Sequence, residues 1–310
     1  MAFPSNAFVA LAAAASWGGG DFSGGMGAKY AAEDAGDATR GALRVIVVGH
    51  ATSLGALLVA LFALHAAWPV GAPMYWALAA GVAAGISLTA FYIALSRGEM
   101  GVSAALSGLL AAAIPALTSA FVEGRPGALT IAGFVLAGAA IWAIAAGPSP
   151  ENADGAAAKG TMALALIGGV GFGFYFTALK FANPLGVLEP IALARSSSLA
   201  TCLVLLAGIG IFGRGTPEAP EPASRGLAKT PWLSGKAIFW AMGIALLDTG
   251  GNLLFIASTR LGRLDVASVL ASLYPAGTIL LAAWHLHERP TRRQLGGMLL
   301  ALVAVVMITV

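Results

Sequence analysis

The chain has few charged residues and one cysteine. Only 10% of its 310 residues are charged, whereas soluble domains carry roughly 25%. The 17 basic and 14 acidic side chains lie mostly between apolar runs, which indicates anchoring of helix ends and no nucleic-acid surface. Cys202 has no second cysteine for a disulfide or a thiolate metal site. The scarcity of charge argues against a soluble protein.

Apolar residues make up the rest of the pattern. The hydrophobic share is 58% and the mean hydropathy is +0.85, and a bilayer core is crossed by about 20 apolar residues in a helix. About ten spans would then use nearly the whole length, so we predict an all-α integral membrane protein whose first apolar segment is a span and not a cleaved leader. The expected helices cover residues 5–29, 40–64, 73–96, 101–122, 127–147, 160–182, 186–212, 236–259, 264–287 and 291–310.

The two halves of the sequence resemble each other, which indicates an internal repeat. Arg44 matches Arg195 at an offset of 151 residues, and later matches fall at offsets of 163 to 165 because the connection at residues 213–235 is longer than its counterpart. The other matching segments are 28–31 with 179–182, 92–97 with 255–260, Ser103 and Ser107 with Ser268 and Ser272, and 125–126 with 289–290.

The repeat predicts two domains, residues 1–150 and residues 151–310, with five transmembrane helices in each. An odd number of spans gives the two halves opposite orientations in the membrane. We therefore expect a 5+5 inverted repeat around a central cavity.

Several residues are typical of one transporter superfamily: Trp17-Gly18, Arg44, Tyr92, Pro275 and Glu288-Arg289. With the helix plan, they make the whole chain resemble the drug/metabolite transporter superfamily in its ten-helix form with paired EamA domains. The resemblance implies an exporter of amino acids or other small metabolites, with the aromatic amino-acid exporters as the nearest subgroup. It also implies a cavity bounded by helices 1, 3, 4, 6, 8 and 9, and a place in the bacterial cytoplasmic membrane.

Ionisable residues inside apolar spans are the first candidates for a binding site, because they usually face a protein interior or an aqueous cavity. Asp21 lies one helical turn beyond Trp17, so its carboxylate could meet an ammonium group while the indole stacks on a cation or a ring. The alternative is that the glycines around Asp21 allow close helix packing and Asp21 hydrogen-bonds across that contact.

A second polar face is predicted on the helix at 236–259. Asp248, Asn252 and Phe255 share this face, with Asp248 as a protonatable cavity carboxylate or a buried structural hydrogen-bonding group. The other candidate cavity residues supply short hydroxyl groups or aromatic walls, although each could instead pack or anchor a helix: Tyr92, Ser103, Ser107, Phe172, Tyr175, Ser268, Ser272 and Tyr274.

Other ionisable residues are expected to be structural. Arg44 and Arg195 are interpreted as fold markers that snorkel to the interface or bind carbonyls. His50 could relay protons, but a packed histidine is the more common case. His285 and His287 point to different helix faces, so we expect no metal site there. We also expect no cofactor.

The functional prediction is a secondary transporter that works by alternating access on a small-molecule substrate. A multidrug, nucleoside or sugar exporter is the alternative, and an intramembrane enzyme or a channel would need a catalytic constellation or rings of like groups that the sequence does not display. Membrane lipid is the other expected partner. Proton coupling and a monomeric state stay open. The side of the membrane on which the two termini lie also stays open, since the distribution of basic loops places them outside and the resemblance places them inside.

Overall fold

The computed structural model describes residues 5–97, 100–145, 155–212, 232–285 and 291–309. Every described regular element is helical, and helices occupy each of the ten expected ranges. The elements are α1 (Ser5–Ala35), α2 (Ala38–Ala63), α3 (Ala72–Ser96), α4 (Met100–Val122), α5 (Ala128–Ala145), α6 (Gly155–Ala182), η1 (Asn183–Leu185), α7 (Leu188–Phe212), α8 (Gly235–Gly243), η3 (Ile244–Asp248), α9 (Thr249–Leu261), α10 (Leu264–Ala271), α11 (Tyr274–His285) and α12 (Arg292–Thr309).

Six helical segments are long and apolar enough to cross a membrane, and two shorter ones are also apolar. The six are Ala38–Ala63, Ala72–Ser96, Lys159–Leu185, Leu188–Ile209, Gly235–Leu261 and Leu264–His285, and the shorter ones are Leu106–Val122 and Ala128–Ala143. An integral membrane protein is therefore supported. Ten crossings and the inverted repeat stay predictions.

Among the differences from the expected helices, three concern α1, η3 and the break between α10 and α11. The first continues to Ala35 and not to residue 29, because charged residues such as Glu33 are compatible with a helix that extends beyond the apolar layer. The expected helix at 236–259 contains a π-helical turn, η3. The expected helix at 264–287 is interrupted between α10 and α11 just before Pro275, which cannot donate to the carbonyl of Ala271.

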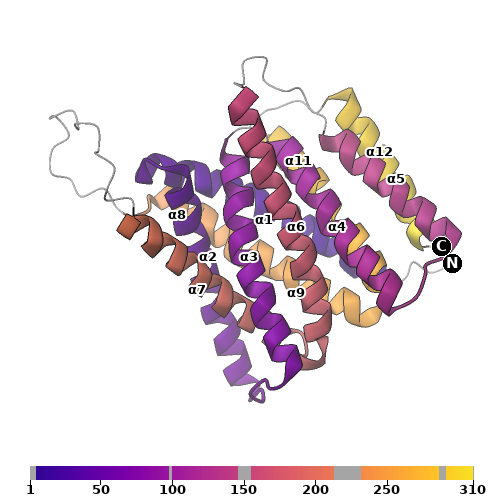
Figure 1. Cartoon of the computed structure of the whole chain (residues 1–310), viewed down its shortest axis with the longest axis horizontal. Helices are drawn as coiled ribbons and strands as arrows, with labels where there is room; N and C mark the ends of the chain where they lie inside the picture. Colours follow the sequence, from indigo (N-terminus) through magenta and orange to yellow (C-terminus); the bar gives the residue numbers. More distant parts are fainter. Residues whose placement is uncertain (1–4, 98–99, 146–154, 213–231, 286–290, 310) are drawn as a thin grey trace.

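The helices form one bundle, with the pair α5 and α12 at its side (Figure 1). α3 packs on α6 and α7, α6 also packs on α4, and α1 packs on α2, α9 and α11. α5 and α12 pair with each other along one side of the bundle. Large apolar side chains such as Val59, Phe62 and Trp284 are exposed, as expected where a bundle faces lipid.

Glycines bring several helices into close contact. A Cβ at Gly20 would lie 3.0 Å from the Asp248 nitrogen, and a Cβ at Gly24 would lie 2.2 Å from the Tyr92 ring. The expectation that the α1 glycines allow close packing is confirmed at both positions. At Gly81 on α3, a Cβ would lie 2.0 Å from the Ala194 carbonyl oxygen on α7.

We expect Gly81→Ala to destabilise the protein by about 1–3 kcal/mol, because the added methyl group separates α3 from α7. Gly55→Ala is the matched control, since a Cβ at Gly55 meets nothing within 4 Å. Thermal unfolding in detergent measures both variants. An unchanged unfolding temperature for Gly81→Ala would contradict the close α3–α7 contact.

Candidate functional site

A small cavity lies among helices from both halves of the chain. Its volume is about 30 Å³. A volume of roughly 10–15 Å³, measured in the same way, is enough for one water molecule. In this conformation the cavity therefore has room for only one or two waters. Its lining consists of Trp17, Asp21, Ala84, Leu88, Phe172, Tyr175, Phe176, Arg195, Asp248, Asn252 and Tyr274.

The local structure of two elements positions the acidic side chains. α1 lies against η3 because Gly20 has no side chain to separate it from the Asp248 backbone. Trp17 and Asp21 are four residues apart on α1, so they lie on one helix face. The π-helical turn ends at Asp248, and such turns re-aim side chains and are frequent at functional sites.

A buried ion pair joins α7 to η3. Arg195 is only 3% exposed, and its Nη2 donates to the Asp248 carboxylate and, at 3.1 Å, to Thr249 Oγ1. Arg195 Nη1 lies 2.6 Å from Nε2 of His50 on α2, and His50 Nδ1 lies 3.0 Å from Ser198 Oγ. The expectation that Arg195 is structural is compatible with these contacts, but Arg195 does not snorkel to the interface: it is a buried charge within a polar network.

The network continues into the cavity wall through Asn252. The Asn252 amide nitrogen donates to the Asp248 carbonyl at 2.7 Å, and its amide oxygen accepts from the Tyr175 hydroxyl at 2.9 Å. Tyr175 is thus held by a chain of hydrogen bonds that begins at Arg195. A buried network of this kind fixes the positions of its members.

Aromatic rings form another part of the cavity wall. Trp17 stacks on Phe176 with ring centroids 4.8 Å apart and planes inclined by 16°. Phe255 lies behind both rings, 5.5 Å from Trp17 and 4.7 Å from Phe176. The cavity lining thus includes both charged side chains and a pair of stacked rings.

Asp21 differs from Asp248 in its surroundings. Both carboxylates line the cavity and both are almost fully buried, with exposed fractions of 7% and 6%. Asp248 is paired with Arg195, but in the described part of the chain Asp21 has neither an ion pair nor a hydrogen bond to its carboxylate. Asp21 is the cavity charge that a ligand could meet.

The structure brings seven of the predicted site residues together around the cavity and places the other five elsewhere. Ser107 donates to the Ala165 carbonyl oxygen at 2.8 Å and so holds α4 against α6. The Tyr92 hydroxyl is buried against α1 and, within the described ranges, has no partner, and the same is true of the hydroxyl groups of Ser268 and Ser272. Ser103 is buried and lies outside the lining.

Four lining residues were not among the candidates: Arg195, Phe176, Ala84 and Leu88. Arg195 had a usable signal, since it is a cation inside one apolar run and Asp248 is an anion inside another. The other three are apolar residues in apolar helices, where every position looks alike. Glu288 and Arg289, which carried part of the resemblance, lie outside the described residues.

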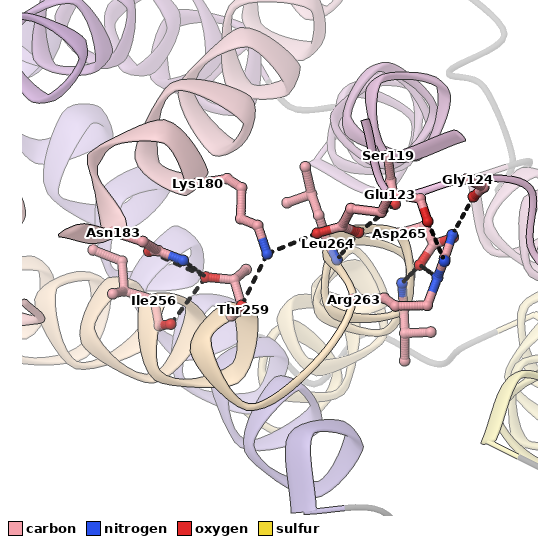
Figure 2. Close-up of polar contacts among 11 residues, drawn as sticks. Ser119, Glu123, Gly124, Lys180, Asn183, Ile256, Thr259, Arg263, Leu264 and Asp265 are labelled. Carbon is pink, nitrogen blue, oxygen red and sulfur yellow. Dashed lines mark hydrogen bonds and ion pairs between the residues drawn. The ribbon is translucent and has the colours of Figure 1, made fainter. Parts of the chain in front are cut away.

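A second polar cluster joins the ends of several helices (Figure 2). Glu123, just after α4, pairs with Lys180 of α6 at 2.7 Å and accepts from Ser119 and from the Leu264 backbone nitrogen. Arg263 donates to the carbonyl oxygens of Glu123 and Gly124 and to Asp265. The Glu123 cluster, as we call these residues, fastens α4 to α6 and to the α9–α10 connection.

The Glu123 carboxyl is held in its charged form. Partial burial alone would raise its pKa, but hydrogen bonds from Lys180, Ser119 and the Leu264 backbone, together with the Lys180 charge, bring the pKa below its ordinary value. The cluster therefore contributes stability at neutral pH. Elsewhere in the described ranges, no group of three or more His, Cys, Asp or Glu side chains could hold a metal ion.

Comparison with known proteins identifies a transporter domain. Residues 159–310 match the EamA-like transporter family, so the second half of the chain carries a domain typical of membrane transporters of small molecules. A crystal structure of another protein has a TM-score of 0.68 and 16% sequence identity, over 100% of this chain and 99% of that one. At that identity the likeness extends to the fold alone. No curated protein matches the sequence.

We expect Asp248→Asn to destabilise the protein by about 3–5 kcal/mol, because it leaves the buried Arg195 charge without a carboxylate. Adding Arg195→Met removes that charge and restores part of the loss. Thermal unfolding of the single and double variants measures the coupling. Equal unfolding temperatures for Asp248→Asn and the wild type would show that the pair is not formed.

The Glu123 cluster predicts a pH dependence. Because folding lowers the Glu123 pKa, its stabilisation is present above the ordinary value of 4.5 and is lost as pH falls through the lowered folded value. At pH 7 the free energy of unfolding of Glu123→Gln should therefore be lower than that of the wild type, by roughly 1 kcal/mol or less for this partly exposed pair. The difference should shrink toward pH 3.5. Glu33→Gln, at an exposed position of α1, is the control, and a difference that does not change with pH would refute the ion pair.

Proposed function

From the EamA-like transporter domain in residues 159–310, we propose that the chain is a secondary transporter that exports amino acids or related small metabolites across the cytoplasmic membrane by alternating access. The observation that carries this proposal is the cavity, which combines buried charges with a flat aromatic wall. These are the groups that recognise a small amphipathic solute with a charged end.

The packing of the helices supports an inverted repeat. Exchange of the two halves maps α1 onto α6, α2 onto α7, α3 onto α8–α9, α4 onto α10–α11 and α5 onto α12. Under this exchange the α3–α6 contact becomes the α1–α9 contact, and the α4–α6 contact becomes the α1–α11 contact. The α2–α7 and α5–α12 contacts map onto themselves. Such symmetry offers two equivalent arrangements of the halves, which is the basis of alternating access.

The size of the cavity supports movement of the helices during transport. Space for one or two waters does not admit an amino acid, so helices must separate for a substrate to enter. The Glu123 cluster fastens α4, from the first half, to α6 and the α9–α10 connection, from the second (Figure 2). Rocking of one half against the other would break this contact and open that end of the bundle.

We expect Trp17→Ala to slow counterflow of aromatic amino acids by about tenfold, because the variant removes the stacked wall of the cavity. The assay follows uptake of labelled aromatic and aliphatic amino acids into preloaded proteoliposomes. Trp284→Ala is the matched control, since Trp284 is 77% exposed on the outer face. If no amino acid is exchanged, that substrate class is excluded and the assay turns to drugs, nucleosides and sugars. Equal counterflow rates for Trp17→Ala and Trp284→Ala would show that Trp17 does not contact the transported substrate.

A further inference from the structure

The charges around the cavity do not balance. Arg195 and Asp248 form an ion pair and cancel each other. His50 adds no charge here: Arg195 Nη1 can only donate, so His50 Nε2 must accept and carries no proton. Asp21 remains, and in its ionised form it gives the cavity one net negative charge.

An unbalanced charge in an apolar bundle is costly, and the cost is relieved either by protonation of the carboxyl group or by a partner of opposite sign. In the part of the chain that the structure describes, no Lys, Arg or His side chain pairs with Asp21, although Asp21 lines the cavity and is 7% exposed. A ligand cation would supply the missing charge. A zwitterionic ligand would leave the net charge unchanged, and an anionic ligand would increase it.

The cavity has little to offer a carboxylate group. Both terminal nitrogens of Arg195 are engaged, Nη2 by Asp248 and Thr249 and Nη1 by His50. Only Arg195 Nε is without a partner within the described residues. A substrate carboxylate at that atom would share the cavity with two aspartates, so like-charge repulsion disfavours it.

The aromatic wall defines the rest of the ligand. Trp17 lies on the same face of α1 as Asp21, and its indole is stacked on Phe176. An ammonium group beside Asp21 is therefore near the Trp17 ring, and an indole ring attracts a cation and packs against a flat apolar body. The ligand that fits this site is therefore a short molecule that carries both an aromatic ring and a cationic group.

We propose that the cavity selects an aromatic monoamine without a carboxylate, bound through an ion pair between its ammonium group and Asp21, over the amino acid with the same ring. The proposal rests on the proposed transport function and narrows its substrate class. Asp21 is the residue that determines specificity, while Asp248 serves to position Arg195.

The test uses four compounds with one ring and different charges: 2-phenylethylamine, phenylalanine, 3-phenylpropionate and 2-phenylethanol. Binding to the purified full-length protein is followed by tryptophan fluorescence and thermal shift, and transport by counterflow in proteoliposomes, all at pH 7. We expect the amine to bind at least tenfold more tightly than phenylalanine. Asp21→Asn should reduce amine binding at least tenfold, and Asp21→Glu, which retains the charge, should preserve the preference.

Glu33→Gln is the matched control, because it removes one negative charge from an exposed position on the same helix. Gel filtration confirms that each variant is folded. Failure of the amine to bind, a preference for phenylalanine, or equal amine binding by wild type and Asp21→Asn would overturn the proposal. Exchange of phenylalanine that does not depend on Asp21 would overturn it and leave the transport function intact. Asp21-dependent amine binding without any counterflow would support the site and contradict the transport function.

Discussion

The ion pair between Arg195 and Asp248 is the interaction on which the rest of the cavity depends. A guanidinium group inside an apolar bundle is tolerated only with a carboxylate and further acceptors around it. Asp248, Thr249 and His50 supply these partners from η3, α9 and α2. The pair therefore fixes α7 against three other segments and, through Asn252, holds one wall of the cavity.

The close approach of α1 is the second requirement. Because Gly20 lies against the Asp248 backbone and Gly24 against the Tyr92 ring, α1 can place Trp17 and Asp21 beside the ion pair. The result is a cavity in which one aspartate is ion-paired and the other is not. This difference between two aspartates gives the cavity its chemistry.

The sequence predicted the positions of the helices well, since long apolar runs between charged connections can hardly be anything else. It did not predict η3, which does not change the hydropathy. The break before Pro275 was missed because the segment was assigned from its hydropathy, although the proline itself marks the break. Arg195 was interpreted together with Arg44, its match in the repeat, but Arg44 is only partly buried and donates to the Trp232 carbonyl. Matching positions in the two halves thus have different environments, and only side-chain contacts reveal this. Ser107 was expected in the cavity for a similar reason: hydrogen bonding to a neighbouring helix and lining a cavity require the same residue type.

Access to the cavity from both sides of the membrane is the central claim, and cysteine labelling tests it most directly. Cys202 is the one cysteine in the chain and is buried, so Cys202→Ser with Leu88→Cys places a single thiol in the cavity lining. A membrane-impermeant maleimide applied from either side of oriented proteoliposomes should label this thiol, and substrate should slow labelling from both sides. Labelling from one side only, under all substrate gradients, would contradict alternating access.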